Sequence, residues 1–149
     1  MPNGARAGWA SMDPFVFPRS GYDQVGGLVF LPRMLDKVRL HAAGRLADDY
    51  NLGKGLDTRL CRLLGLAYDD IAAKAREEAD DAVVLEWCYA QGRRLSDDEI
   101  GYFNAFMTKR GWRDEASEKL KASKEKRGAA ARDDIQTTFD LQDLDEGRK

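Results

Sequence analysis

The sequence predicts an all-α fold: a compact single domain of about six short helices. Apolar residues recur at helical spacing in several segments, and a glycine follows the end of most of these segments. No stretch alternates apolar and polar residues for long enough to form a useful β-strand. A chain of 149 residues has the length of one ordinary domain, and folding at this size buries roughly 70% of the surface that the unfolded chain exposes.

The composition is that of a globular protein with a densely charged surface. Hydrophobic residues make up 43% and charged residues 34% of the chain, and the net charge is only -2. This balance gives no general attraction to nucleic acid or to anionic membranes. No apolar run approaches the ~18 residues of a membrane span, and the N-terminus lacks the apolar centre of a signal peptide. We therefore expect a cytoplasmic protein that does not bind membranes, with Cys61 and Cys88 as buried thiols.

The chain divides into three predicted parts. Residues 1–21 contain three prolines and three glycines without a helical or strand period, which predicts an extended N-terminal arm. Residues 22–132 form the helical domain. Residues 133–149 carry a net charge of -4 and follow a segment, 109–132, that carries +5. We expect this acidic C-terminal tail to dock on the domain, with Phe139 as its main anchor.

The first helix is predicted over 32–43, because Pro32 suits the first turn of a helix and an apolar stripe follows it. A shorter helix over 22–30 is a weaker prediction, since Gly26 and Gly27 disfavour it. Further helices are predicted over 57–64, 69–78, 81–90, 97–110 and 113–127.

Two helix ends carry particularly clear signals. Ser96 and Glu99 have the spacing of a capping box, in which each side chain bonds the backbone amide of the other residue. Gly65 is placed to end the helix over 57–64 in a left-handed conformation, which would bring Leu66 to Cys61.

Several stretches resemble a bacterial family of uncharacterised proteins catalogued as domain of unknown function 5069. The stretches are Leu31-Pro32-Arg33-Met34-Leu35-Asp36-Lys37, Glu86-Trp87-Cys88, Asn104-Ala105-Phe106-Met107, Lys109-Arg110-Gly111-Trp112-Arg113-Asp114-Glu115 and Asp133-Asp134-Ile135-Gln136-Thr137. The resemblance covers most of the chain from Pro18 onward. It implies a small bacterial protein and agrees with the helical prediction, but it implies no activity and supplies no catalytic residue.

The first candidate site is a charged cluster on the helix over 32–43, formed by Arg33, Asp36, Lys37, Arg39 and His41. One interpretation is an anion site with His41 as a general base. The other is a solvated helix face on which Asp36 pairs with basic neighbours, which is the commoner role of a charge run.

Asn104 is the second candidate, because it lies on the apolar side of a strongly patterned helix. A buried amide must be satisfied by backbone, water or ligand. It either makes a structural hydrogen bond or lines a pocket with His41.

The third candidate is the corner at 109–115, where one helix ends and the next begins. Arg110 and Arg113 flank Trp112 there, and basic groups near free amides favour phosphate or carboxylate. The alternative is a helix–helix corner that Gly111 and Trp112 fix for structural reasons.

Other signals for cofactors are weak. The glycine-rich stretch 51–55 lacks the spacing of a phosphate-binding P-loop. One histidine and two distant cysteines do not make the ligand set of a structural zinc site. No metal or cofactor is therefore predicted.

These observations favour a small helical domain that binds a small anionic ligand or a protein partner through Arg33, Asp36, Lys37, Asn104, Arg110, Trp112 and Arg113. The alternative is a small enzyme that uses general acid–base chemistry at His41 while Arg33 or Arg113 holds an anionic substrate. A nucleic-acid-binding protein ranks third, because only residues 109–132 are basic enough to support it. The sequence carries no signal for a particular oligomeric state.

Overall fold

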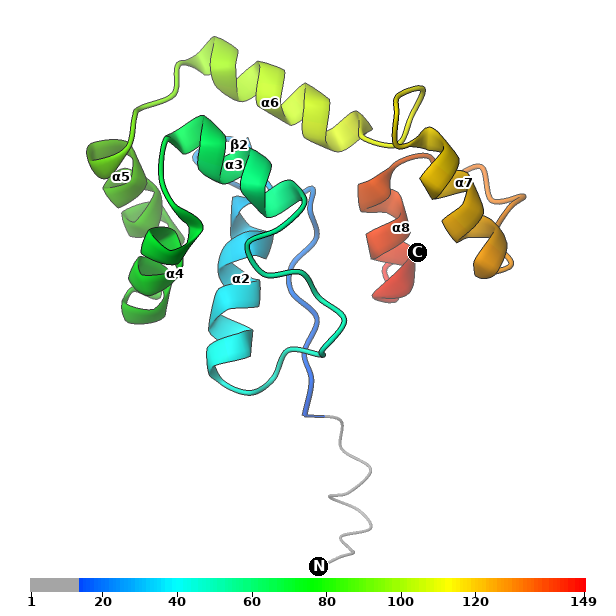
Figure 1. The fold of residues 1–149 in the computed structure, drawn as a ribbon, viewed down its shortest axis with the longest axis horizontal. Coiled ribbons are helices and arrows are strands. Elements are labelled where there is room, and N and C mark those ends of the chain that lie inside the picture. Colours follow the sequence, from blue (N-terminus) through cyan, green and yellow to red (C-terminus); the bar gives the residue numbers. More distant parts are fainter. Residues whose placement is uncertain (1–13) are drawn as a thin grey trace, which may run out of the picture.

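The structure is a computed structural model that describes residues 14–149. In this part of the chain, seven helices and one two-stranded hairpin make up the regular structure (Figure 1). The predicted helical fold is confirmed. The predicted arm at 1–21 falls mainly on residues 1–13, which lie outside the described residues, and residues 14–20 have no regular structure.

Most elements follow one another with short connections. Their bounds are β1 Gln24–Val25, β2 Leu28–Val29, α2 Leu31–Ala42, α3 Leu56–Leu64, α4 Tyr68–Glu77, α5 Asp81–Gln91, α6 Asp97–Lys109, α7 Ser117–Lys126 and α8 Thr138–Asp145. Longer segments, 43–55 and 127–137, precede α3 and α8. The helix α2 packs against α4, and α4 packs against α5. Helix α6 lies over β2 and reaches α8, so that α7 and α8 stand beside the group formed by α2 to α5 (Figure 1).

A β-hairpin occupies the segment in which a short helix was predicted, so that prediction is wrong. Gln24 pairs with Val29 and Val25 pairs with Leu28 in an antiparallel ladder. The two residues between the strands, Gly26 and Gly27, have φ of 56° and 78°. A two-residue type I′ hairpin turn requires positive φ at both central residues, and glycine adopts positive φ without steric cost.

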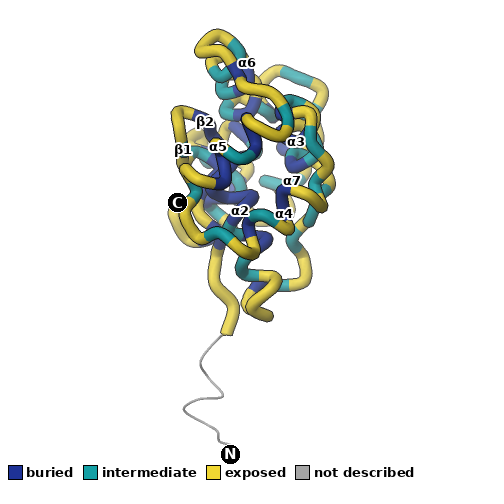
Figure 2. The backbone as a smooth tube through the Cα atoms, turned by 90° about the vertical axis from the view of Figure 1, so that its left-hand side faces the viewer, coloured by how far each residue is buried: buried dark blue, intermediate teal, exposed yellow. Residues whose placement is uncertain are grey.

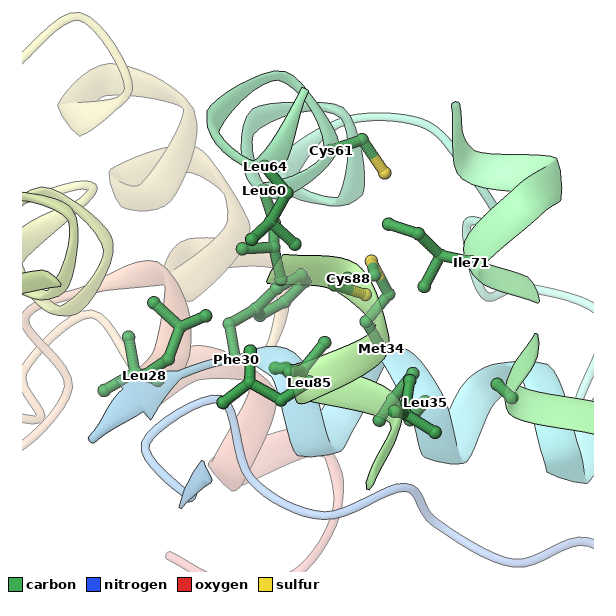
Figure 3. Close-up of a cluster of buried hydrophobic side chains, with 14 of the residues drawn as sticks. Leu28, Phe30, Met34, Leu35, Leu60, Cys61, Leu64, Ile71, Leu85 and Cys88 are labelled. Atoms are coloured by element: carbon green, nitrogen blue, oxygen red, sulfur yellow. The ribbon is translucent and has the colours of Figure 1, made fainter. Parts of the chain in front are cut away.

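The core is centred on α2, where Leu31, Met34 and Leu35 are fully buried. Buried positions follow α2 and β2, and exposed positions cover the outside (Figure 2). Figure 3 shows Cys61 of α3, Ile71 of α4 and Cys88 of α5 around Met34. Both cysteines are free and buried, as predicted, and burial raises the pKa of each thiol to about 11.

Both clear helix-end predictions are confirmed. Ser96 accepts a hydrogen bond from the amide of Glu99 at 3.1 Å, and Glu99 accepts one from the amide of Ser96 at 2.9 Å. Gly65 is left-handed with φ of 72°, and the amide of Leu66 donates to the Cys61 carbonyl at 3.1 Å.

Helix α7 begins four residues later than the predicted helix over 113–127. Arg113 has φ of 51°, outside the helical region. The Asp114 carboxylate accepts hydrogen bonds from the amides of Gly111 and Ala116, at 3.0 Å and 2.9 Å. These hydrogen bonds occupy backbone amides that a helix would otherwise use, so the chain stays non-helical until α7 begins at Ser117.

Helix α8 was not predicted and lies within the acidic segment 133–149. Thr137 caps it by accepting a hydrogen bond from the amide of Asp140 at 3.1 Å. Phe139 is fully buried, stacks on Phe30 at 5.8 Å between ring centroids, and meets Tyr22 edge-on at 5.3 Å. Residues 138–145 therefore contribute directly to the core.

No helix within residues 14–149 has both the length and the apolar character needed to cross a membrane.

Candidate functional site

Two buried ion pairs start from neighbouring turns of α2. Both guanidinium NH2 groups of Arg33 donate to the Glu146 carboxylate at 2.8 Å. One turn later, Lys37 Nζ donates to the two carboxylate oxygens of Asp57 at 2.8 Å and 3.0 Å. Both cationic side chains are at most 7% exposed, and neither carboxylate side chain is more than 3% exposed. Removing one partner of such a pair is costly because the other charge stays buried.

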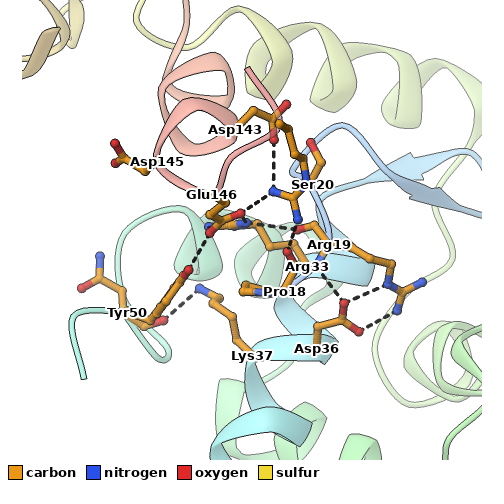
Figure 4. A network of polar contacts seen from close by, with 12 residues as sticks. Pro18, Arg19, Ser20, Arg33, Asp36, Lys37, Tyr50, Asp143, Asp145 and Glu146 are labelled. Atoms are coloured by element: carbon orange, nitrogen blue, oxygen red, sulfur yellow. Dashed lines mark hydrogen bonds and ion pairs between the residues drawn. The ribbon is translucent and has the colours of Figure 1, made fainter. Parts of the chain in front are cut away.

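Glu146 is the centre of the larger polar network (Figure 4). Besides Arg33, it accepts hydrogen bonds from the Tyr50 hydroxyl at 2.7 Å and from the Arg148 guanidinium. Burial raises the pKa of Glu146, but the hydrogen bonds from Arg33 and Tyr50 and the charge of Arg33 lower it more strongly. The pKa is therefore held below the ordinary value, and the carboxylate is ionised.

The second pair fixes the loop before α3. Lys37 Nζ also donates to the Asn51 carbonyl at 2.8 Å, and Asp57 accepts from the amide of Gly53 at 2.9 Å. Burial lowers the pKa of Lys37, although the Asp57 carboxylate opposes this shift. The loop 49–57 is thus attached to α2 by polar contacts at the point where it turns into α3.

A cleft of about 550 Å³ adjoins both ion pairs. Loop 49–57 and α3 form one side of it, and α7 and α8 form the other. Seven basic side chains line it against four carboxylates: Arg33, Lys37, Lys54, Arg59, Arg110, Lys119 and Arg127 against Asp49, Asp57, Asp145 and Glu146. The cleft therefore concentrates positive charge in a chain whose net charge is -2.

The cations of the cleft differ in how far their charge is already neutralised. Arg127 pairs with Asp145 at 2.6 Å, as Arg33 and Lys37 pair with their own carboxylates. Lys54 and Lys119 are exposed, and neither has an acidic group within 4.0 Å in the part of the chain that the structure describes. These two ammonium groups are available to a ligand.

An aromatic ring holds two arginines at the edge of the cleft. The guanidinium carbons of Arg59 and Arg110 lie 5.2 Å and 5.5 Å from the centroid of the Phe106 ring. A cation–π contact of this kind orients a guanidinium while its N–H groups stay free to donate. Arg110 also pairs with Glu115 at 2.7 Å, whereas Arg59 makes no ion pair within residues 14–149.

Apolar groups and one strained residue complete the lining, which includes Leu56, Leu120 and Leu141. Phe30 adopts a left-handed φ of 73° directly before α2. This conformation is uncommon for a bulky residue and persists only where the surroundings enforce it. The amide of Phe30 donates to the Gly21 carbonyl at 3.0 Å, and its ring is held against Phe139.

Comparison with protein families identifies the chain. Residues 16–148 match the model of the family described as domain of unknown function (DUF5069). The chain belongs to this family. The predicted resemblance is thereby confirmed, and the family description assigns no activity. No curated protein matches the chain.

The structure of this DUF5069 protein brings together three of the predicted site residues. Arg33, Lys37 and Arg110 all line the cleft. Asp36 points elsewhere, since its carboxylate accepts from the guanidinium of Arg19 at 2.9 Å and 2.8 Å (Figure 4).

The two other residues of the predicted corner face a separate groove. Trp112 and Arg113 line a second hollow, of about 430 Å³. Leu120 of α7 lines both this hollow and the cleft. Arg113 stacks on the Trp112 ring at 5.0 Å, and 46% of Trp112 is exposed.

Asn104 and His41 lie apart from the cleft and from each other. Asn104 attaches α6 to the hairpin, because its side chain accepts from the Val29 amide at 3.1 Å and donates to the Gly27 carbonyl at 2.7 Å. His41 is exposed in the last turn of α2. Ten residues separate it from Leu31 at the hairpin end of that helix, a rise of roughly 15 Å. The pocket in which His41 and Asn104 would meet is not formed.

Several residues of the cleft were missed at the level of sequence. Glu146, Tyr50 and Asp57 have no local motif, because the contacts Arg33–Glu146, Tyr50–Glu146 and Lys37–Asp57 span 113, 96 and 20 residues. Lys119 has a weaker signal: it belongs to the basic segment 109–132, which was noted only as a charge block.

Proposed function

We propose that this DUF5069 protein binds a small anionic molecule, a phosphate or a carboxylate, in the cleft between loop 49–57 and α7–α8. The observation that carries the proposal is the excess of cations over carboxylates in the cleft lining, in a chain that is acidic overall. A concave site lined by one sign of charge raises the local concentration of oppositely charged ligands.

The cations of the cleft that make no buried ion pair would contact the ligand; among them, Arg110 pairs only with carboxylates that stay partly exposed. Arg59 and Arg110 present planar donor groups that suit phosphate and carboxylate oxygens. Lys54 and Lys119 would add two mobile point charges from opposite sides of the cleft. Ser123 and Thr138 also line the cleft and supply hydroxyl donors.

The buried pairs would serve as the rigid base of this site. Arg33 and Lys37 are held by Glu146 and Asp57, so their charges are balanced before any ligand arrives. Their role would be to fix loop 49–57 and α8 against α2, because each pair joins α2 to one side of the cleft. A preformed site loses less conformational entropy on binding.

The apolar part of the cleft lining favours an anion that also has an apolar portion. Leu56, Leu120 and Leu141 border the cationic groups. Such a mixture suits a ligand that carries an anionic group on an apolar or aromatic body. Gln142 Oε1, also in the lining residues, is buried without a hydrogen-bond partner in residues 14–149 and would accept from a donor on that body.

Calorimetric titration with inorganic phosphate, pyrophosphate and benzoate tests the proposal. The double variant Lys54→Gln/Lys119→Gln should bind the best of these probes at least about tenfold more weakly, since charge-assisted hydrogen bonds contribute about 1.5–3 kcal/mol each. The control is Arg76→Gln/Lys126→Gln, which removes two exposed positive charges outside the cleft. Equal weakening in both variants, or no saturable binding of any probe, would contradict the proposal.

A further inference from the structure

The outward face of α6 combines exposed aromatic residues with small residues. The residues on this face are Asp98, Gly101, Tyr102, Ala105, Phe106 and Lys109, spaced over about three helical turns. All six are exposed, and Tyr102 is 72% exposed. Phe106 is 38% exposed even though Arg59 and Arg110 lie on its ring. Two aromatic side chains one turn apart thus remain partly exposed on this face.

Charge is separated along the same face. Asp98 lies in the first turn of α6 and Lys109 is the last residue of the helix. Neither side chain has an ion-pair partner within residues 14–149. The face is therefore acidic at one end, aromatic in the middle and basic at the other end.

Gly101 supplies an independent observation. A glycine in the middle of a helix is destabilising relative to alanine. No heavy atom lies within 4 Å of the position that a Cβ would take at Gly101. The fold of the single chain therefore does not require a glycine here, whereas close approach of another molecule would.

We propose that two copies of this chain associate through α6, antiparallel, about a twofold axis. One register places each aromatic ring opposite a small residue: Tyr102 opposite Ala105 of the second copy, and Phe106 opposite Gly101 of the second copy. The same register places Asp98 opposite Lys109 of the second copy at both ends. A twofold contact requires such self-complementarity, because one surface must fit itself.

The size of this contact sets the strength of the dimer. Helix α6 has 13 residues and is therefore about 20 Å long. One helix pair of this length buries less than the roughly 1,200–2,000 Å² of a standard stable interface. The dimer is accordingly weak, and its population rises with protein concentration.

Sedimentation equilibrium over a range of concentrations tests the interface by charge reversal. Asp98→Lys and Lys109→Asp each turn two attractive contacts of the dimer into two repulsive ones. Each single variant should dimerise about tenfold more weakly than the wild-type chain. The double variant Asp98→Lys/Lys109→Asp restores opposite charges across the axis and should recover dimerisation.

Matched controls separate this effect from a change in helix stability. Asp69 is the second residue of α4, as Asp98 is of α6, and Lys126 is the last residue of α7, as Lys109 is of α6. Asp69→Lys and Lys126→Asp should leave association unchanged. A monomeric wild-type chain at all concentrations, equal effects in the controls, or a double variant that does not regain association would overturn the proposal.

Discussion

Replacing Glu146 by glutamine should destabilise the fold strongly, because it leaves the Arg33 guanidinium buried without a countercharge. Only 4% of the Arg33 side chain is exposed, and two of its three hydrogen bonds go to Glu146. Breaking a buried ion pair from one side costs about 3–5 kcal/mol. The glutamine carbonyl keeps one acceptor, so we expect a loss near 3 kcal/mol, a large part of the stability of about 5–15 kcal/mol of an ordinary domain.

The measurement is urea denaturation followed by circular dichroism, with Glu86→Gln as the control. Glu86 pairs with Arg94 at 2.6 Å, but both side chains are more than 60% exposed. An exposed pair contributes about 0–1 kcal/mol. If Glu146→Gln lost no more stability than Glu86→Gln, the buried network would not have the energetic role inferred from its geometry.

The pH dependence gives a second test of the same network. The pKa of Glu146 in the folded chain is lowered from its ordinary value of 4.5. A lowered pKa contributes stability that is fully present above the ordinary value and is lost as the pH falls through the folded-state pKa. The stability difference between the wild-type chain and Glu146→Gln should therefore shrink below about pH 4.5. A difference that stays constant down to pH 2.5 would show that the carboxylate is not stabilised in its ionised form.

Three further substitutions test other parts of the structure. Ser96→Ala should cost ~1 kcal/mol in a thermal melt, since it removes one half of the capping box of α6; an unchanged melt would mean that the cap contributes nothing. Gly92→Ala should cost at least about 2 kcal/mol in urea denaturation, because its Cβ would lie 2.0 Å from the Leu64 carbonyl oxygen. His41→Ala should stay within about 0.5 kcal/mol of the wild-type stability and leave phosphate binding unchanged, because His41 is exposed outside the cleft; loss of binding would instead support a site at His41.

The helices with strong local signals could be predicted from the sequence, whereas the hairpin and α8 have only weak local signals. The capping box at Ser96 and the left-handed stop at Gly65 need only a few neighbouring residues, and both are present. The strands have two residues each, which is too short for an alternating pattern to show. The usable signal for the hairpin was the Gly26-Gly27 pair between apolar residues. For α8 it was Thr137, three residues before Asp140.

Only some basic residues of the candidate site could be predicted from the sequence. Arg33, Lys37 and Arg110 are recognisable as cations beside apolar stripes. The carboxylate partners of Arg33 and Lys37 are not, because Glu146 is 113 residues from Arg33 and Asp57 is 20 residues from Lys37. The predicted pocket of His41 and Asn104 depended on tertiary placement in the same way: His41 lies in the last turn of α2, whereas Asn104 of α6 bonds the hairpin that precedes the first turn of α2.

The long-range contacts of the C-terminal segment have a kinetic consequence. Arg33 and Glu146 are 113 residues apart, Tyr22 and Asp140 are 118 apart, and Pro18 and Arg148 are 130 apart. Closing such long loops costs conformational entropy before the contacts that they bring together can form. Contacts between distant residues therefore form more slowly than local ones. This chain should therefore form its helices, whose contacts are local, before the contacts of its C-terminal segment. Its early folding phase should form the helices, and the slower phase should seat Phe139 against Phe30.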